Sequence, residues 1–235
     1  MTESAVLLQP AFILQHRKYR ESSLILDVLT RDHGVLSILA KGVKKRKSTT
    51  AGLLLPFAAL RLSYQGHSDF KVLTACELNA PPQLTGLALF CGYYVNELVF
   101  HFLHKHDPCP EVYRLYHQCL QQLQDGAAIE QALRSFELKL IEDAGYALSL
   151  DCEAEGGKPV CKDRRYRYEA GVGLLGCDNG YIRGDTLQAL QAGTMLDGVG
   201  LAEAKQLMRR VLDDHLQGKQ LKSRAVLAKV IQYLH

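Results

Sequence analysis

The chain has 235 residues, 47% of them hydrophobic, and a formal net charge of only +3. This composition excludes a largely disordered chain, because it supplies enough apolar side chains for a core. The charge is unevenly distributed. The first 80 residues carry 11 Lys and Arg against 6 Asp and Glu, a net of +5, and the rest of the chain is net negative. We therefore expect an acidic partner for the N-terminal part.

The cysteine pattern and the distribution of apolar residues indicate the cellular compartment of the protein. Seven cysteines, an odd number, lie at irregular spacing at positions 76, 91, 109, 119, 152, 161 and 177. The first ten residues lack the basic and apolar regions of a signal peptide, and no run approaches the ~18 apolar residues of a membrane span. We expect free thiols, a reducing cytoplasm and no membrane partner.

The first 80 residues predict a small closed β-barrel. Apolar and β-branched runs favour five strands, at 5–17, 22–30, 35–42, 57–64 and 70–78. The turn signals "RDHG" and "QGHSD" separate strands two and three and strands four and five. The connector 42–56 is too long for a hairpin turn, and loops of that length are usually functional or disordered.

The prolines of "NAPPQ" end this pattern, and a helical period replaces it. Helices are predicted at 84–102, 112–123, 129–144, 184–192, 201–216 and 221–234. Between them, 151–184 is rich in turns and indicates a small hairpin. The predicted class is α+β, with an N-terminal barrel domain (1–80) and a helical domain (81–235) carrying an inserted subdomain at about 151–184.

Four motifs follow one another along the chain. The first is "AFILQHRKYRESSLILDVLTRDHGVLSILAKGVKKRKS", and its informative residues are Arg17, Tyr19, Glu21, Ser23, Ile25, Thr30, Gly34, Ala40, Lys41 and Gly42. The others are "YYVNELVFHFL", "RSFELKLIEDAGYALSLDC" and "LKSR". In this order, the motifs resemble the bacterial RecO family of DNA repair and recombination mediators, and the resemblance covers nearly the whole chain.

The resemblance implies an OB-fold barrel and a non-enzymatic mediator without a cofactor. It implies binding of single- and double-stranded DNA, annealing of complementary strands, and a cytoplasmic protein that joins the nucleoid when acting. It also implies work with RecR and with the acidic C-terminal tail of the single-strand-binding protein, to load the recombinase RecA. The alternatives are a general RNA- or ribosome-associated OB protein, and an adaptor whose helical domain does the work.

Basic side chains are the predicted DNA-binding residues, because they contact phosphates without reading sequence. They are Arg17, Lys18, Arg20, Arg31, Lys41, Lys44, Lys45, Arg46, Lys47, Lys71, Lys222 and Arg224. The run 41–47 could instead be a solvated surface or a nuclear-import tag, and Lys222 and Arg224 could cap the fold. Tyr19, Tyr64 and Phe70 are candidates for base stacking or for the barrel core.

A binding site for the partner's tail needs an apolar pocket and a cation. Arg134, with Leu133 and Phe136 beside it, matches the family's "R-x-F-E-L" and is the predicted clamp. The alternative is a surface arginine paired with Glu130 or Glu137 at helical spacing.

No metal site and no catalytic residue is predicted. Some RecO proteins carry a four-cysteine zinc site in the insertion, but Cys152, Cys161 and Cys177 form no C-x-x-C pair, so the region is interpreted as a degenerate zinc finger. Glu97, His101 and His104 share a helical face, with His106, Asp107 and Cys109 following, and histidines at a helix end are the alternative. The sequence has no G-x-S-x-G motif and no Walker loop, and no G-x-G-x-x-G follows a strand.

Overall fold

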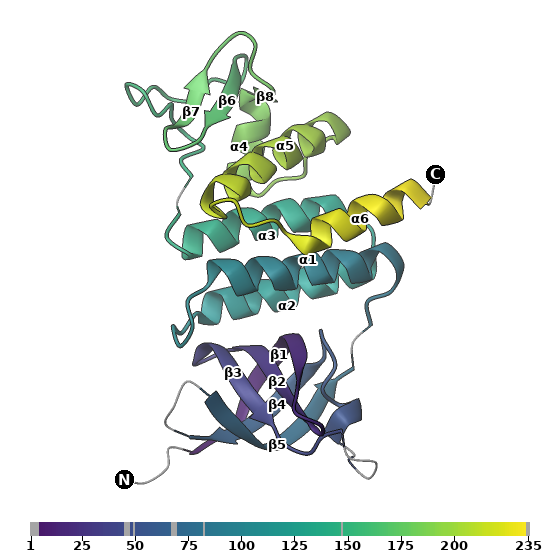
Figure 1. Ribbon diagram of the computed structural model, residues 1–235. Helices are drawn as coiled ribbons and strands as arrows, with labels where there is room; N and C mark the ends of the chain where they lie inside the picture. Colours follow the sequence, from purple (N-terminus) through teal and green to yellow (C-terminus); the bar gives the residue numbers. More distant parts are fainter. Residues whose placement is uncertain are drawn as a thin grey trace. The chain divides into compact units, whose positions relative to one another are not determined.

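The computed structural model describes residues 5–44, 48, 50–66, 70–81, 83–146 and 148–233. The chain forms two compact units (Figure 1). The first contains Met1–Gln124 and Ser223–His235, and the second contains Asp125–Lys222. The first unit therefore combines two segments of sequence, and the second unit lies between them in sequence. The predicted boundary at residue 80 lies where the last barrel strand ends, and the division into domains 1–80 and 81–235 stays a prediction.

Five strands close into a barrel in the order β1-β2-β3-β5-β4. They are β1 (Ala5–Tyr19), β2 (Ser23–Thr30), β3 (Gly34–Ala40), β4 (Ala59–Gln65) and β5 (Phe70–Ala80). Strands β3 and β5 pair in parallel and every other pair is antiparallel. This is an OB-type barrel, so the predicted α+β class with an N-terminal OB fold is confirmed.

Alternating residues of the strands fill the barrel. In β2, Leu24, Leu26 and Val28 lie in the interior cluster, and the residues between them point outward. The rest of this cluster is Ala11, Ile13, Leu36, Ile38, Ala40, Val43, Leu54, Ala58, Leu60, Leu62 and Tyr64. Val43 and Leu54 are the informative members, because they fix both ends of the basic connector to the barrel.

Two helices cover the outer face of the barrel, α1 (Gly86–Phe102) and α2 (Pro110–Asp125) (Figure 1). Phe12 of β1 is 1% exposed, and its ring lies 5.0 Å from the ring of Tyr116 on α2. Asn96 joins the layers: its Nδ2 donates to the carbonyl of Leu14 at 2.8 Å, and Tyr116 donates its hydroxyl to Asn96 Oδ1 at 2.6 Å. The outward residues of β2, including Leu29, are buried as a result.

A buried carboxylate continues this covered face. Asp27 of β2 is 1% exposed and accepts hydrogen bonds from Ser37 Oγ at 2.6 Å and Gln15 Nε2 at 3.0 Å. Lys105, which follows α1, donates its Nζ to Ser37 Oγ at 3.0 Å. The partners of Asp27 come from β1 and β3, so its bonds fix the three strands to one another.

The second unit combines three helices with a small sheet. The helices are α3 (Ile129–Asp143), α4 (Gly184–Ala192) and α5 (Gly198–His215). The sheet has the order β7-β6-β8, from β6 (Arg165–Glu169), β7 (Gly173–Gly176) and β8 (Ile182–Arg183). It lies inside the predicted insertion and adds a short third strand to the expected hairpin. Its likeness to a zinc finger stays a prediction.

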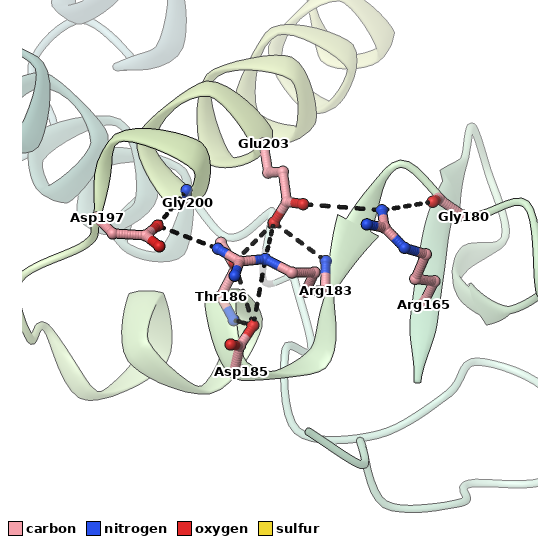
Figure 2. Close-up of polar contacts among 8 residues, drawn as sticks. All are labelled: Arg165, Gly180, Arg183, Asp185, Thr186, Asp197, Gly200 and Glu203. Atoms are coloured by element: carbon pink, nitrogen blue, oxygen red, sulfur yellow. Dashed lines mark hydrogen bonds and ion pairs between the residues drawn. The ribbon is translucent and has the colours of Figure 1, made fainter. Parts of the chain in front are cut away.

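An ion-pair network fastens this sheet to the helices (Figure 2). Glu203 of α5 is buried and accepts hydrogen bonds from Thr186 Oγ1 at 2.7 Å and from Arg183 Nε at 3.1 Å. The Arg183 guanidinium also donates to Asp197 at 3.0 Å, while Asp197 caps α5 by accepting from the Gly200 N–H at 2.5 Å. These cap and guanidinium bonds hold the pKa of Asp197 below its usual value.

Candidate nucleic-acid interface

The β1–β2 turn and the end of β3 lie side by side at one end of the barrel. Ile25 of β2 pairs with Arg17 on one side and with Leu39 on the other. Beyond the strands, the Lys44 N–H donates to the carbonyl of Ser22 at 3.0 Å. Cations that are more than twenty positions apart in sequence therefore meet on one surface.

We call this surface the basic end, formed by Arg17, Lys18, Arg20, Lys41 and Lys44. All five residues are exposed. Within the described ranges, none of them forms an ion pair with a carboxylate. The basic end therefore presents uncompensated positive charge to solvent, which is the electrostatic requirement for phosphate contact.

An open depression of about 670 Å³ lies within the basic end. Its lining residues are Tyr19, Arg20, Glu21, Ser22, Ser23, Leu39, Lys41 and Gly42. The Tyr19 side chain is 37% exposed, and the Arg20 guanidinium carbon lies 5.4 Å from its ring centroid. An exposed ring among cations is the arrangement by which single strands are held, with stacking for a base and charge for the backbone.

Three of the predicted contacts, Lys45, Arg46 and Lys47, fall outside the described residues. They directly follow Lys44, whose backbone is fixed to the β1–β2 turn. The connector returns through η1 (Thr50–Gly52) to Leu54 in the core. The basic run therefore starts at the basic end, and its role in DNA binding stays a prediction.

Two other predicted contacts lie elsewhere. Arg31 follows the last residue of β2, and the eight residues of that strand put it about 25 Å from the β1–β2 turn. Its Nε pairs with Asp32 at 2.9 Å, and this hydrogen bond lowers the pKa of the Asp32 carboxyl. Lys71 pairs with Ile38 in the sheet and donates its Nζ to the Gly66 carbonyl at 2.9 Å. The structure does not gather these two cations with the basic end.

The three candidates for base stacking do not share one environment. Tyr64 is 2% exposed and belongs to the barrel core, and burial raises the pKa of its hydroxyl to about 12. The side chain of Phe70 is outside the described part of the structure. Tyr19 is the candidate that the structure places on the surface.

Sequence reasoning missed the covered face. OB folds commonly bind oligonucleotides on the face of strands 2 and 3 and on neighbouring loops. Here that face carries Ile25, Asp27 and Leu29 of β2 with Val35 and Ser37 of β3, and all five are buried. The sequence does carry a signal for this burial, because 24–30 has apolar residues on both faces of the strand. A strand with one face open to solvent would alternate apolar and polar residues. This face is therefore closed to nucleic acid.

Comparison with known proteins identifies the family. The model of the N-terminal domain of recombination protein O matches residues 4–82, and the model of its C-terminal domain matches residues 83–225. The chain belongs to the RecO family.

Curated RecO proteins resemble the chain over almost their whole length. "DNA repair protein RecO" of Methylococcus capsulatus is 41% identical over 224 residues, covering 94% of this chain and 93% of its own. The RecO proteins of Nitrosococcus oceani (39% identity, 96% and 94% coverage) and Coxiella burnetii (40% identity, 94% and 98% coverage) are similar. The predicted family is therefore confirmed, and with it a role in DNA repair.

Two RecO motifs that lie far apart in sequence contact each other in the first unit. Helix α6 (Lys222–Tyr233) carries most of "LKSR" and runs beside α1 (Figure 1). Ser223 donates to the carboxylate of Glu97, and the Arg224 guanidinium carbon lies 5.7 Å from the ring centroid of Tyr94. Arg224 therefore helps to hold the fold together, whereas Lys222 is exposed. DNA contact by either residue stays a prediction.

The predicted tail clamp lies inside the second unit. Arg134 is 5% exposed, and its Nη2 donates to Glu137 Oε1 at 2.6 Å. Leu133 and Phe136 are buried beside it. The arginine thus pairs with Glu137, one of the two partners expected for the alternative, but it is buried rather than on the surface. Its role as a clamp stays a prediction.

The candidate metal ligands are dispersed. Helix α1 ends at Phe102 with an extended residue after it, so His104 does not continue the helical face of Glu97 and His101. In the described part of the chain, no three His, Cys, Asp or Glu side chains lie together as a metal site would require. None of the described helices is long and apolar enough to span a membrane.

Proposed function

We propose that this RecO-family protein is a non-enzymatic mediator of DNA repair that binds single- and double-stranded DNA and anneals complementary strands. In this proposal it works with RecR and with the single-strand-binding protein to load the RecA recombinase. The observation that carries DNA binding is the exposed ring of Tyr19, which lines one depression together with the exposed cations Arg20 and Lys41 at the basic end. Annealing and loading rest in addition on the family membership.

The basic end suits annealing because it leaves the base edges of a bound strand free. Lysine and arginine on an exposed surface contact phosphates, and such contacts position a strand without occupying its base edges. One exposed tyrosine can stack on a base without reading its identity. A strand held in this way keeps its hydrogen-bonding edges available for a complementary strand.

The partner's tail would enter the second unit at α3. Its terminal carboxylate would replace Glu137 as the partner of Arg134, and its apolar side chain would pack near Leu133 and Phe136. The buried ion pair supports the choice of Arg134, because its guanidinium binds a carboxylate within the fold. A peptide ending in a carboxylate should bind more tightly than the same peptide ending in an amide, and Arg134→Ala should remove the difference.

Annealing of two complementary labelled oligonucleotides tests the central claim. The basic-end variant combines Arg17→Gln, Arg20→Gln and Lys41→Gln. The control variant removes three exposed cations elsewhere, by Arg114→Gln, Lys139→Gln and Arg209→Gln. We expect the basic-end variant to anneal roughly tenfold more slowly than the control, since the two carry equal net charge.

Equal annealing rates for the two variants would contradict the proposed interface. A second arm uses DNA coated with single-strand-binding protein, either complete or lacking its tail. Annealing that depends on the tail supports the partnership, and annealing that ignores it contradicts the partnership. Much tighter binding to single-stranded RNA than to DNA of equal length would favour the RNA-binding alternative.

A further inference from the structure

The barrel has a second cavity, at the end opposite the basic end. We call it the mouth pocket, a space of about 180 Å³ lined by Val6, His33, Leu36, Tyr64, Lys71, His106 and Pro108. The lining residues come from the β2–β3 turn, the first residues of β1 and β5, the end of β4 and the segment after α1. The proposed basic end uses none of these residues.

A buried hydroxyl without a partner borders the mouth pocket. Tyr64 is 2% exposed, and its hydroxyl forms no hydrogen bond with the residues that the structure describes. Buried polar groups in folded proteins are nearly always paired, because leaving a buried donor unpaired is unfavourable. A bound acceptor would satisfy this hydroxyl.

The charged and titratable groups around this hydroxyl favour an anion as the acceptor. Lys71 and the imidazoles of His33 and His106 line the cavity, and Lys71 uses one of its three N–H donors on the Gly66 carbonyl. The nearby carboxylate, Asp32, is held by Arg31 and also accepts from Gln9 Nε2 at 3.1 Å. Because Arg31 neutralises Asp32, the pocket keeps the positive charge of Lys71.

The wall of the pocket is built by backbone contacts. The His106 N–H donates to the Val35 carbonyl at 3.0 Å, which fixes the segment after α1 against the start of β3. A side-chain contact adds to this: the His33 ring meets the Tyr64 ring edge to face, with centroids 6.2 Å apart. Lining side chains that are fixed in this way are preorganised for a ligand.

We propose that the mouth pocket binds a phosphate monoester at the end of a nucleic-acid strand. An internal phosphodiester has a sugar on each side and needs an open groove, whereas this cavity of about 180 Å³ reaches the buried side chains of Leu36 and Tyr64. A terminal phosphate offers acceptor oxygens to the Tyr64 hydroxyl and the Lys71 ammonium. This inference rests on the proposed DNA binding, and it gives the protein a strand-end site separate from the basic end.

The test compares oligonucleotides of one sequence with a 5′-phosphate, a 3′-phosphate or only hydroxyl ends. Fluorescence anisotropy gives their affinities, and inorganic phosphate serves as a free competitor. We expect at least one phosphorylated oligonucleotide to bind about five- to tenfold more tightly than the hydroxyl-ended one. Millimolar inorganic phosphate should remove that advantage.

The variant Tyr64→Phe removes the hydroxyl and keeps the apolar ring of the barrel core. It should abolish most of the phosphate advantage, while affinity for the hydroxyl-ended strand stays the same. The control Tyr113→Phe removes a hydroxyl from a tyrosine outside the pocket and should keep the advantage. The variant His33→Gln, on the exposed turn, should also reduce the phosphate advantage, and it serves as the test if Tyr64→Phe fails to fold.

Equal affinity for all three oligonucleotides would overturn the mouth-pocket proposal and leave the basic end intact. A phosphate advantage that survives both Tyr64→Phe and His33→Gln would also overturn it, by placing the end-binding site elsewhere. Calorimetric binding of inorganic phosphate without any preference for phosphorylated strands would assign the pocket to free phosphate, again overturning the strand-end assignment. Failure of the proposed function itself would appear separately, as loss of binding to the hydroxyl-ended strand.

Discussion

Ser223 donates both its backbone N–H and its hydroxyl to one carboxylate oxygen of Glu97, at 2.9 and 2.5 Å, across 126 positions of sequence. The carboxylate lies at the N-terminus of α6, where it satisfies a backbone donor and meets the positive end of the helix dipole. The sequence makes Glu97 a candidate metal ligand with His101, whereas its described contacts join α6 to α1.

Replacing Glu97 by Gln should weaken the contact between α6 and α1. The amide keeps the shape of the side chain but loses the charge that strengthens both hydrogen bonds, so the free energy of unfolding should fall by about 1–2 kcal/mol. Urea denaturation measures the difference. Glu155→Gln, at an exposed carboxylate in the second unit, is the matched control and should change stability by less than about 0.5 kcal/mol. Equal effects would show that the charge of Glu97 does not stabilise the α6 contact.

The basic end should determine how binding to single-stranded DNA depends on salt. Each phosphate contact contributes about 0.7 to the slope of log affinity against log salt. The variant with Arg17→Gln, Arg20→Gln and Lys41→Gln should therefore lower that slope by about 2 in titrations at several salt concentrations. The control variant with Arg114→Gln, Lys139→Gln and Arg209→Gln should keep the wild-type slope. An unchanged slope in the basic-end variant would place the phosphate contacts elsewhere.

Gly34 should not tolerate a side chain. Its φ of +64° is a left-handed conformation, and an added Cβ would lie 2.0 Å from the Asp107 carbonyl oxygen. Gly34→Ala should cost about 3 kcal/mol or more, or abolish folding, because strain and overlap add. Gly126→Ala separates the two causes, since Gly126 has φ +72° with nothing within 4 Å and should cost only about 1–2 kcal/mol. Similar losses in denaturation midpoint would contradict the close contact at Asp107.

Alkaline pH should destabilise the barrel through Tyr64. Burial raises the pKa of Tyr64 to about 12, and the nearby Asp32 charge adds to this effect, whereas the ordinary value is 10.0. Between these values the unfolded chain releases a proton that the folded chain keeps, so stability falls as pH rises, by up to about 1.4 kcal/mol per pH unit. Below pH ~10 both states keep the proton and this contribution is constant.

Urea midpoints of wild type and Tyr64→Phe, measured between about pH 9 and 11.5, test the prediction. The variant should lose stability less steeply above pH ~10. Tyr113, whose pKa burial raises to about 12 as well, is present in both proteins and cancels in the comparison. Parallel curves would contradict the altered titration of Tyr64.

The barrel was predictable because its information is local. Apolar alternation, the turn "RDHG" and the two prolines after residue 80 define strands that the structure reproduces within a few residues. The six helices were found in the same way. Closure into a barrel was expected from five short strands, whereas the order β1-β2-β3-β5-β4, with its parallel β3–β5 pair, was not predicted.

The candidate site was only partly predictable, because position on a barrel depends on pairing between distant residues. Arg20 and Lys41 meet since β2 pairs with both neighbouring strands, while Arg31, at the other end of the same strand, is separated from them. Burial of Arg134 could not be deduced from helical spacing, which places an arginine on a face without saying what covers that face. The helical layer over β2 and β3 depends on contacts such as Phe12 with Tyr116.

The return of α6 to α1 has a consequence for synthesis of the chain. Ribosomes make proteins from the N-terminus, and domains usually fold in the order in which they emerge. Here the second unit, ending at Lys222, is complete while α6 is still being made. The first unit, although most of it precedes the second in sequence, acquires α6 only after the second unit has been made. A nonsense mutation near codon 222 would therefore spare the second unit and damage the barrel-bearing one.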